Sequence, residues 1–137
     1  MSPSQPWRRF LLLLVVYHLI QLDGFLLLDG SNRLKVVVRG ARGLHGDAAG
    51  ETDAYVKVSY GFTTKMTPYI EENDNPEWNH NFDFEVVPGY KLEFNVYDKD
   101  IFFDDWLGRC VVPISNNGTG SCDLVGGGTF FYWFSIS

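Results

Sequence analysis

The sequence predicts an all-β fold, an antiparallel sandwich of eight strands with Greek-key connections. From Arg33 onward, apolar and polar residues alternate with a period of two, and helical periodicity is nearly absent. Glycine and proline interrupt this alternation at short, regular intervals. The chain has 137 residues, of which 45% are hydrophobic and 16% aromatic, enough to bury one core. These observations predict one sandwich domain whose loops gather at its two ends.

Each expected strand is a short alternation bounded by turn residues. The first is rich in valine, which favours extended backbone. The turn at Asn75 and Pro76 precedes a strand in which Phe82 and Phe84 share one face. A run of three glycines precedes the last strand, which is aromatic. The expected strands are 34–39, 53–60, 63–67, 81–85, 91–97, 107–112, 121–125 and 129–136.

The amino-terminal segment has the pattern of a secretory signal peptide. Arg8 and Arg9 precede an apolar run at 10–20. A membrane-spanning helix needs about 20 uninterrupted apolar residues, whereas His18 and Asp23 interrupt this one, so a retained anchor is the weaker alternative. We expect residues 1–24 to be a signal peptide, cleaved between 24 and 30. Residues 31–137 then form the domain of a secreted protein.

Export affects how the two cysteines are interpreted. Cys110 and Cys122 are the only cysteines, and an oxidising compartment favours their pairing over two separate buried thiols. Between them, Asn117, Gly118 and Thr119 form a sequon, which makes Asn117 a candidate glycosylation site.

The acidic residues are concentrated in two of the expected loops. The net charge of −6 argues against nucleic-acid binding, which requires a basic face. Five aspartates flank the loop after the first strand and the loop after the strand 91–97, and a sixth is an alternative at the outer position. They are Asp47, Asp53, Asp98, Asp100 and Asp105, with Asp104 as the alternative.

A sandwich can bring these two loops to the same end. Carboxylates held close together repel one another unless protons or a cation neutralise them. Calcium suits such loops because it takes about six to eight hard oxygen ligands in flexible geometry. Zinc is disfavoured because no histidine or cysteine cluster accompanies the acids, and an EF-hand is excluded because Phe102 occupies its third ligand position. The alternative is that each aspartate only stabilises a turn, but five at two strand ends favour an ion site.

The same residues resemble a C2 domain, over most of the chain after the leader. The matching segments are 34–44, 52–58, 75–79, 97–100 and 105–108. The resemblance implies a sandwich of type II topology that holds calcium in loops at one end and docks to phospholipid. It implies that the five aspartates are calcium ligands, assisted by the carbonyl of Lys99. The segment 104–110 is similar to C2 domains of the perforin type, although the pore-forming domain that precedes them is not expected here.

Apolar residues lie between the acids of the second loop. Ile101, Phe102 and Phe103 are expected at the loop tip, where exposed apolar side chains are costly unless a surface such as a bilayer covers them. Trp106 is a fourth candidate for membrane insertion, with packing against the sandwich as an equal alternative.

These features predict a monomeric calcium-dependent module that binds phospholipid membranes peripherally. An enzyme is disfavoured because no serine, cysteine or histidine constellation accompanies the carboxylates. Two alternatives stay open: a calcium-stabilised extracellular module that binds a protein partner, and an accessory or isoform of a perforin-like cytolytic protein.

Overall fold

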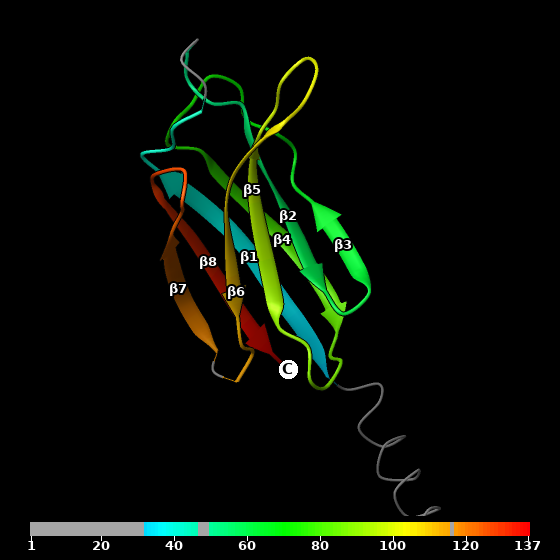
Figure 1. Cartoon of the computed structure of the whole chain (residues 1–137). Coiled ribbons are helices and arrows are strands. Elements are labelled where there is room, and N and C mark those ends of the chain that lie inside the picture. The colour runs from blue at the N-terminus through cyan, green and yellow to red at the C-terminus, as the bar shows by residue number, and fades with distance from the viewer. Residues whose placement is uncertain (1–31, 47–49, 116) are drawn as a thin grey trace, which may run out of the picture. The chain divides into compact units, whose positions relative to one another are not determined.

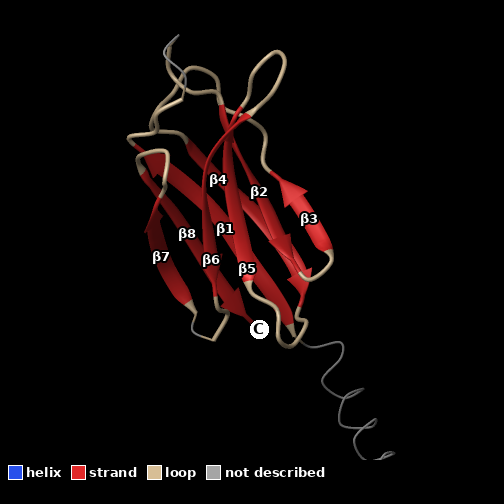
Figure 2. Ribbon diagram, in the orientation of Figure 1, coloured by secondary structure: helices blue, strands red, loops and turns tan. Residues whose placement is uncertain are grey.

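In the computed structural model, two antiparallel sheets of four strands each stack face to face (Figure 1). The structure describes residues 32–46, 50–115 and 117–137. One sheet has the strand order β4-β1-β8-β7 and the other β3-β2-β5-β6. The described ranges contain strands and loops without a helix (Figure 2). The strands are β1 (Arg33–Arg42), β2 (Ala54–Tyr60), β3 (Thr63–Met66), β4 (Glu77–Glu85), β5 (Leu92–Asp98), β6 (Asp105–Val112), β7 (Gly118–Asp123) and β8 (Thr129–Ile136). The expected all-β sandwich is confirmed.

All eight expected strands occur, but three begin two or more residues earlier than the alternation predicts. β4 extends back to Glu77, which pairs with Gly40 of β1, so Trp78 belongs to this strand. β6 extends back to Asp105, which pairs with Asp98. β7 starts at Gly118 because its glycines fit against β8, where a Cβ on Gly120 would come within 2.4 Å of the Tyr132 ring. Pairing with a neighbouring strand therefore extends these strands beyond their apolar pattern.

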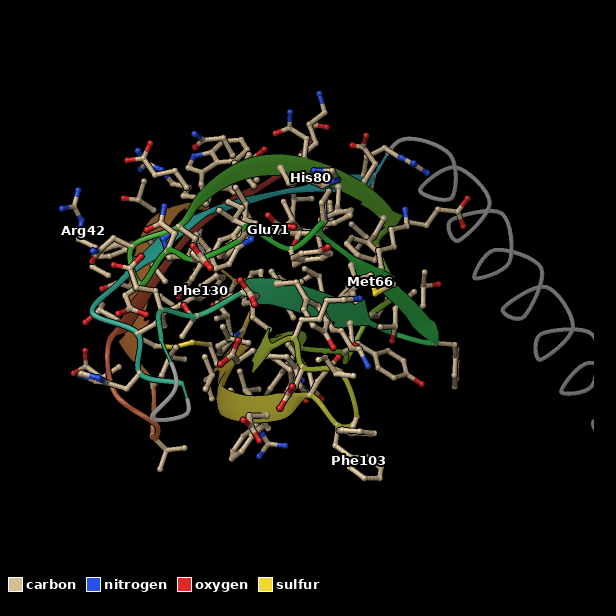
Figure 3. All side chains as sticks on the ribbon, turned by 90° about the horizontal axis from the view of Figure 1, so that it is seen from above. Arg42, Met66, Glu71, His80, Phe103 and Phe130 are labelled. Atoms are coloured by element: carbon tan, nitrogen blue, oxygen red, sulfur yellow. A yellow bond between two sulfur atoms is a disulfide. The ribbon has the colours of Figure 1, made fainter. Side chains whose placement is uncertain are left out.

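The core lies between the inner faces of the two sheets. Phe94 of β5 and Phe130 of β8 meet across the sheets with ring centroids 5.0 Å apart, and both are fully buried. Phe130 lies between the two layers in Figure 3. Trp78 packs beside Phe130, and its indole N–H donates a hydrogen bond to the Ala54 carbonyl over 3.1 Å. Burial of one such aromatic side chain contributes about 1.5–3 kcal/mol to folding.

The expected disulfide is confirmed, and it joins the two sheets. Cys110 lies in β6, at the edge of one sheet, and Cys122 lies in β7, at the edge of the other. Their Cα atoms are 6.2 Å apart, within the range of about 4.4–6.8 Å that disulfides span. The bridge therefore ties together two strands that share no backbone ladder.

The connections divide into two sets, one at each end of the sandwich. The β1–β2, β3–β4 and β5–β6 loops lie at what we call the loop end (Figure 1). The β2–β3 turn and the β4–β5 loop lie at the opposite end. Residues Arg33–Ser137 form one compact unit.

The expected signal peptide and its cleavage site lie outside the described residues, as does Asp47. Within the described part of the chain, no helix has the length and apolar character of a membrane span.

Candidate calcium site

Backbone hydrogen bonds join the β1–β2, β3–β4 and β5–β6 loops at the loop end. The Lys99 N–H donates to the Asp53 carbonyl over 2.9 Å, which links the β5–β6 loop to the start of β2. The Asn73 N–H donates to the Thr52 carbonyl over 2.8 Å, and the Leu44 N–H donates to the Asp74 carbonyl over 2.9 Å. Segments far apart in sequence are thus held in one arrangement.

Asp98 is the buried carboxylate of this end. It continues the inward-facing series of β5 after Val96, and only 7% of its surface is exposed. Its Oδ1 accepts a hydrogen bond from the Asp53 N–H over 2.8 Å. Its Oδ2 lies against Gly46, where a Cβ would come within 2.0 Å. Glycine at position 46 therefore lets the β1–β2 loop approach this carboxylate directly.

Asp105 stands opposite Asp98 in the β5–β6 ladder. Val96 of β5 pairs with Gly108 of β6. The register of the two strands shifts after this pair, so that Tyr97 pairs with Trp106 and Asp98 with Asp105. Directly opposed residues share a face, with Cβ atoms about 4.5–5.5 Å apart. Like charges in this position repel each other, and a bound cation would relieve the repulsion.

Asp104 points elsewhere, toward β2. One of its oxygens accepts the Asp100 N–H over 3.0 Å, and the other accepts the Tyr55 hydroxyl. The Tyr55 hydrogen bond, followed by that of Asp100, lowers the pKa of the Asp104 carboxyl. Burial, followed by the contact with Asp104, raises the pKa of the Tyr55 hydroxyl. The Tyr55 ring also stacks on the Tyr97 ring, with their centroids 5.4 Å apart. Tyr55 is thus held on the sheet, and its hydrogen bond to Asp104 anchors the β5–β6 loop there.

Asp53 and Asp100 each use a carboxylate oxygen to accept a backbone hydrogen bond. Oδ1 of Asp53 accepts the Glu72 N–H over 2.7 Å, and Oδ1 of Asp100 accepts the Ile101 N–H over 2.6 Å. The structure thus brings Asp53, Asp98 and Asp105 to adjoining ends of β2, β5 and β6, with Asp100 following in the loop.

The carboxylate oxygens of this end are hard donors, which calcium prefers, and the resemblance adds the Lys99 carbonyl to them. Across the described ranges, no three His, Cys, Asp or Glu side chains form a ready-made metal group. Asp47, the remaining expected ligand, lies outside those ranges. The residues fit calcium in donor type, and Gly46 brings the segment that leads to Asp47 onto Asp98.

The tip of the β5–β6 loop is apolar and open to solvent. Ile101, Phe102 and Phe103 are 88%, 86% and 84% exposed, and Figure 3 shows Phe103 projecting away from the sandwich. Trp106 does not share this tip. It lies in β6 opposite Tyr97, half exposed, and its indole N–H donates to Oδ1 of Asn95 over 3.0 Å.

Asn117 lies just before β7, away from the loop end. Its Oδ1 accepts the Ile136 N–H over 3.0 Å, and the residue is exposed. Its glycosylation stays a prediction.

Two residues that shape this end were missed in the sequence. For Tyr55 the sequence carried a signal: an aromatic residue on the outer face of its strand, two positions after a candidate ligand, Asp53, can contact the neighbouring loop. Gly46 gave none, because nothing local in the sequence shows that it approaches Asp98, which lies in a distant strand.

Comparison with known proteins agrees with this architecture. Residues 32–126 match the C2 domain family. Human extended synaptotagmin-1 is 41% identical over 76 residues, which cover 54% of this chain and 7% of that protein. Mouse extended synaptotagmin-3 is 46% identical over 69 residues, or 49% of this chain and 8% of that protein. The matched part is thus less than a tenth of these relatives, and they give no support to a particular likeness to perforin.

Solved structures show the same fold. A structure described as a C2 domain superposes with a TM-score of 0.71 and 36% identity, covering 77% of this chain and 98% of that one. A single C2 domain of plant extended synaptotagmin 1 superposes with a TM-score of 0.70 and 25% identity, covering 78% of this chain and 95% of that one. The calcium-bound pair of C2 domains from extended synaptotagmin 2 superposes with a TM-score of 0.69 and 23% identity, covering 77% of this chain and 45% of that one. At this identity the likeness shows the fold alone. The chain belongs to the C2 domain family.

Proposed function

We propose that this C2 domain is a calcium-dependent phospholipid-binding module, acting as a monomer and without enzymatic activity. One observation carries the proposal. The exposed tip of Ile101, Phe102 and Phe103 belongs to the loop that joins β5 to β6, and carboxylates lie at the adjoining ends of β2, β5 and β6. The apolar residues favour a bilayer, whereas the acidic ones are repelled by anionic headgroups. Calcium would remove that conflict.

The proposed ligands are the aspartates at the strand ends. Asp53, Asp98, Asp100 and Asp105 would hold the ion together with the Lys99 carbonyl, and the sequence adds Asp47. Asp105 is the better outer ligand because it stands opposite Asp98, whereas both oxygens of Asp104 accept hydrogen bonds from Tyr55 and Asp100. Bound calcium supplies positive charge and open coordination positions that suit a lipid phosphate.

The loop tip would supply the apolar part of membrane binding. Transfer of one such side chain out of water contributes about 1.5–3 kcal/mol, so three adjacent residues suffice for reversible anchoring. Charge neutralisation controls whether the tip reaches the bilayer, which is an electrostatic switch.

We also propose that the protein is secreted. The Cys110–Cys122 disulfide supports this, because disulfides persist mainly in oxidising compartments. Extracellular modules bind calcium with dissociation constants of about 10⁻⁴ to 10⁻³ M, so an exported copy would be loaded outside the cell. Expression of the full chain in cultured secretory cells tests this. The protein should reach the medium, and Asn117→Gln should increase its mobility on a gel by removing a glycan. Retention of the wild-type protein inside the cells would contradict the proposal.

Cosedimentation with protein-free vesicles tests the membrane function. Phosphatidylcholine vesicles that contain phosphatidylserine are mixed with the purified protein across a calcium titration, beside the Asp98→Asn/Asp100→Asn variant. The wild type should pellet only with calcium, and the variant should stay in solution. If the folded wild type fails to pellet at millimolar calcium, the module does not bind membranes by this route, and a protein partner for the tip becomes the better hypothesis.

A further inference from the structure

A hollow of about 680 Å³ lies on the outer face of the β4-β1-β8-β7 sheet, on a different sheet from β2, β5 and β6, which carry the candidate calcium ligands. Its wall includes Arg39 and Arg42 of β1, Asn79 of β4, and Thr119 and Ser121 of β7, with Phe131 of β8 among them. The volume falls within the range of about 300–1,000 Å³ that is typical of small-molecule sites.

Two irregularities in the strands create this hollow. Between Val38 and Gly40, β1 has one more residue than β8, and that residue is Arg39. On the other side of β1, two residues of β4, Trp78 and Asn79, face the single β1 residue Arg39. Asn79 has a φ of +46°. Bulges redirect side chains, and a non-glycine residue at positive φ is held there by its surroundings. Facing irregularities thus bring Arg39 and Asn79 to one hollow.

The arginines of the hollow have no acidic partner. Within the described part of the chain, neither Arg39 nor Arg42 forms an ion pair, although the protein carries a net charge of −6. Glu77 also lines the hollow, which leaves a local excess of one positive charge. Both arginines are exposed, and Figure 3 shows Arg42 extending outward. The planar guanidinium group suits bidentate contact with phosphate or sulfate.

The remaining groups suit a polyhydroxylated ring. Phe131 is half-buried and offers an apolar surface. It pairs with Ser121 across the β7–β8 ladder, which puts a hydroxyl beside the ring, and Thr119 and Asn79 add further hydrogen-bonding groups. An apolar surface surrounded by a few polar groups is typical of sites for small molecules.

We infer that this hollow binds a sugar or polyol ring that carries a phosphate or sulfate ester. Arg39 and Arg42 hold the ester oxygens, Phe131 contacts the ring, and Asn79, Thr119 and Ser121 bond its hydroxyls. The same chemistry occurs in a free sugar ester and in a glycosylated or phosphorylated lipid headgroup. The inference is independent of calcium and does not rest on the proposed membrane function.

Nuclear magnetic resonance titration of the ¹⁵N-labelled protein in a calcium chelator tests the inference. The probes are glucose 6-phosphate, glucose 6-sulfate, glucose and inorganic phosphate. The two esters should shift the Arg39 and Arg42 Nε–Hε signals saturably and bind at least about tenfold more tightly than inorganic phosphate, because the ring adds contacts. Equal affinities for the esters and for inorganic phosphate would overturn the inference. So would signal shifts confined to β2 and β3, which lie in the other sheet.

Variants locate the contacts. Arg39→Gln/Arg42→Gln should weaken ester binding at least about tenfold, and Phe131→Ser should remove the preference for esters over inorganic phosphate. The matched control is Arg109→Gln, because Arg109 is also exposed but lies on the other sheet, 3.8 Å from Glu93, and its loss should leave binding unchanged. Unchanged ester binding in the double variant would refute the assignment, and thermal melting shows whether each variant is folded.

A final arm distinguishes the two sources of the ligand. Phosphatidylcholine vesicles that contain phosphatidylinositol 4-phosphate are sedimented with the protein in the same chelator. Pelleting that the double arginine variant loses would assign the hollow to a lipid headgroup. Ester binding in solution without pelleting would assign it to a free sugar ester.

Discussion

Both ends of the sandwich expose aromatic side chains, but among the described residues only the loop end has carboxylates in the same loop as its exposed rings. At the loop end, Phe102 and Phe103 lie between Asp100 and Asp104. At the opposite end, Phe62 in the β2–β3 turn is 93% exposed, and its ring packs edge-on against Tyr90 at 5.5 Å. Exposed aromatic rings therefore do not by themselves mark a switchable surface. Under the proposed function, the adjoining charge determines which end responds to calcium.

The largest expected effect comes from removing the aromatic tip. Phe102→Ser/Phe103→Ser should lower vesicle binding in calcium by roughly a hundredfold or more, because each side chain contributes about 1.5–3 kcal/mol on leaving water. Phe62→Ser removes an equally exposed aromatic ring from the opposite end and should leave binding unchanged. Vesicle cosedimentation measures both, and an equal loss in the two variants would show that the ends do not differ.

A smaller effect separates the two neighbouring aspartates. Asp105→Asn should raise the calcium concentration needed for half-maximal vesicle binding by roughly tenfold, because it removes a ligand charge opposite Asp98. Asp104→Asn should change it less, since that carboxylate is bonded to Tyr55 and Asp100. Isothermal calorimetry with calcium and tryptophan fluorescence with vesicles report the two shifts. A greater loss in Asp104→Asn would reverse the ligand assignment.

The smallest effect concerns the contact that anchors the loop. Tyr55 lowers the pKa of Asp104, so the folded-state pKa lies below the unfolded value. The contact therefore stabilises the fold above the unfolded pKa, and this contribution is lost as the pH falls through the folded pKa. Tyr55→Phe should raise the Asp104 pKa, measured by carbon-detected magnetic resonance of the carboxyl group. An unchanged titration would mean that Tyr55 does not hold this side chain.

The strands and the core could be predicted from the sequence because they depend on local alternation. Phe82 and Phe84, for example, are both buried on one face of β4. The charged end was only partly predictable. That Asp98 faces Asp105 depends on a register shift after Val96, and such shifts depend on how two strands pair. Alternation along one strand carries no information about them.

Long-range contacts account for the other differences. The Tyr55–Asp104 hydrogen bond joins residues 49 positions apart, which no local pattern specifies. The position of Trp106 on the outer face of β6 follows from the same register shift, so its sequence neighbours did not separate it from the loop tip. The hollow at Arg39 likewise depends on the bulges that β1 forms with β4 and with β8.

The central claim is that calcium brings the loop end, and only that end, into the bilayer. Tryptophan introduced as Phe102→Trp or Phe62→Trp can be tested for quenching by brominated phosphatidylcholine in vesicles that contain phosphatidylserine, with the wild type as background. The account predicts calcium-dependent quenching at position 102, its reversal by a chelator, and no added quenching at position 62. Quenching at position 62 in calcium, or equal quenching at position 102 with and without calcium, would contradict it.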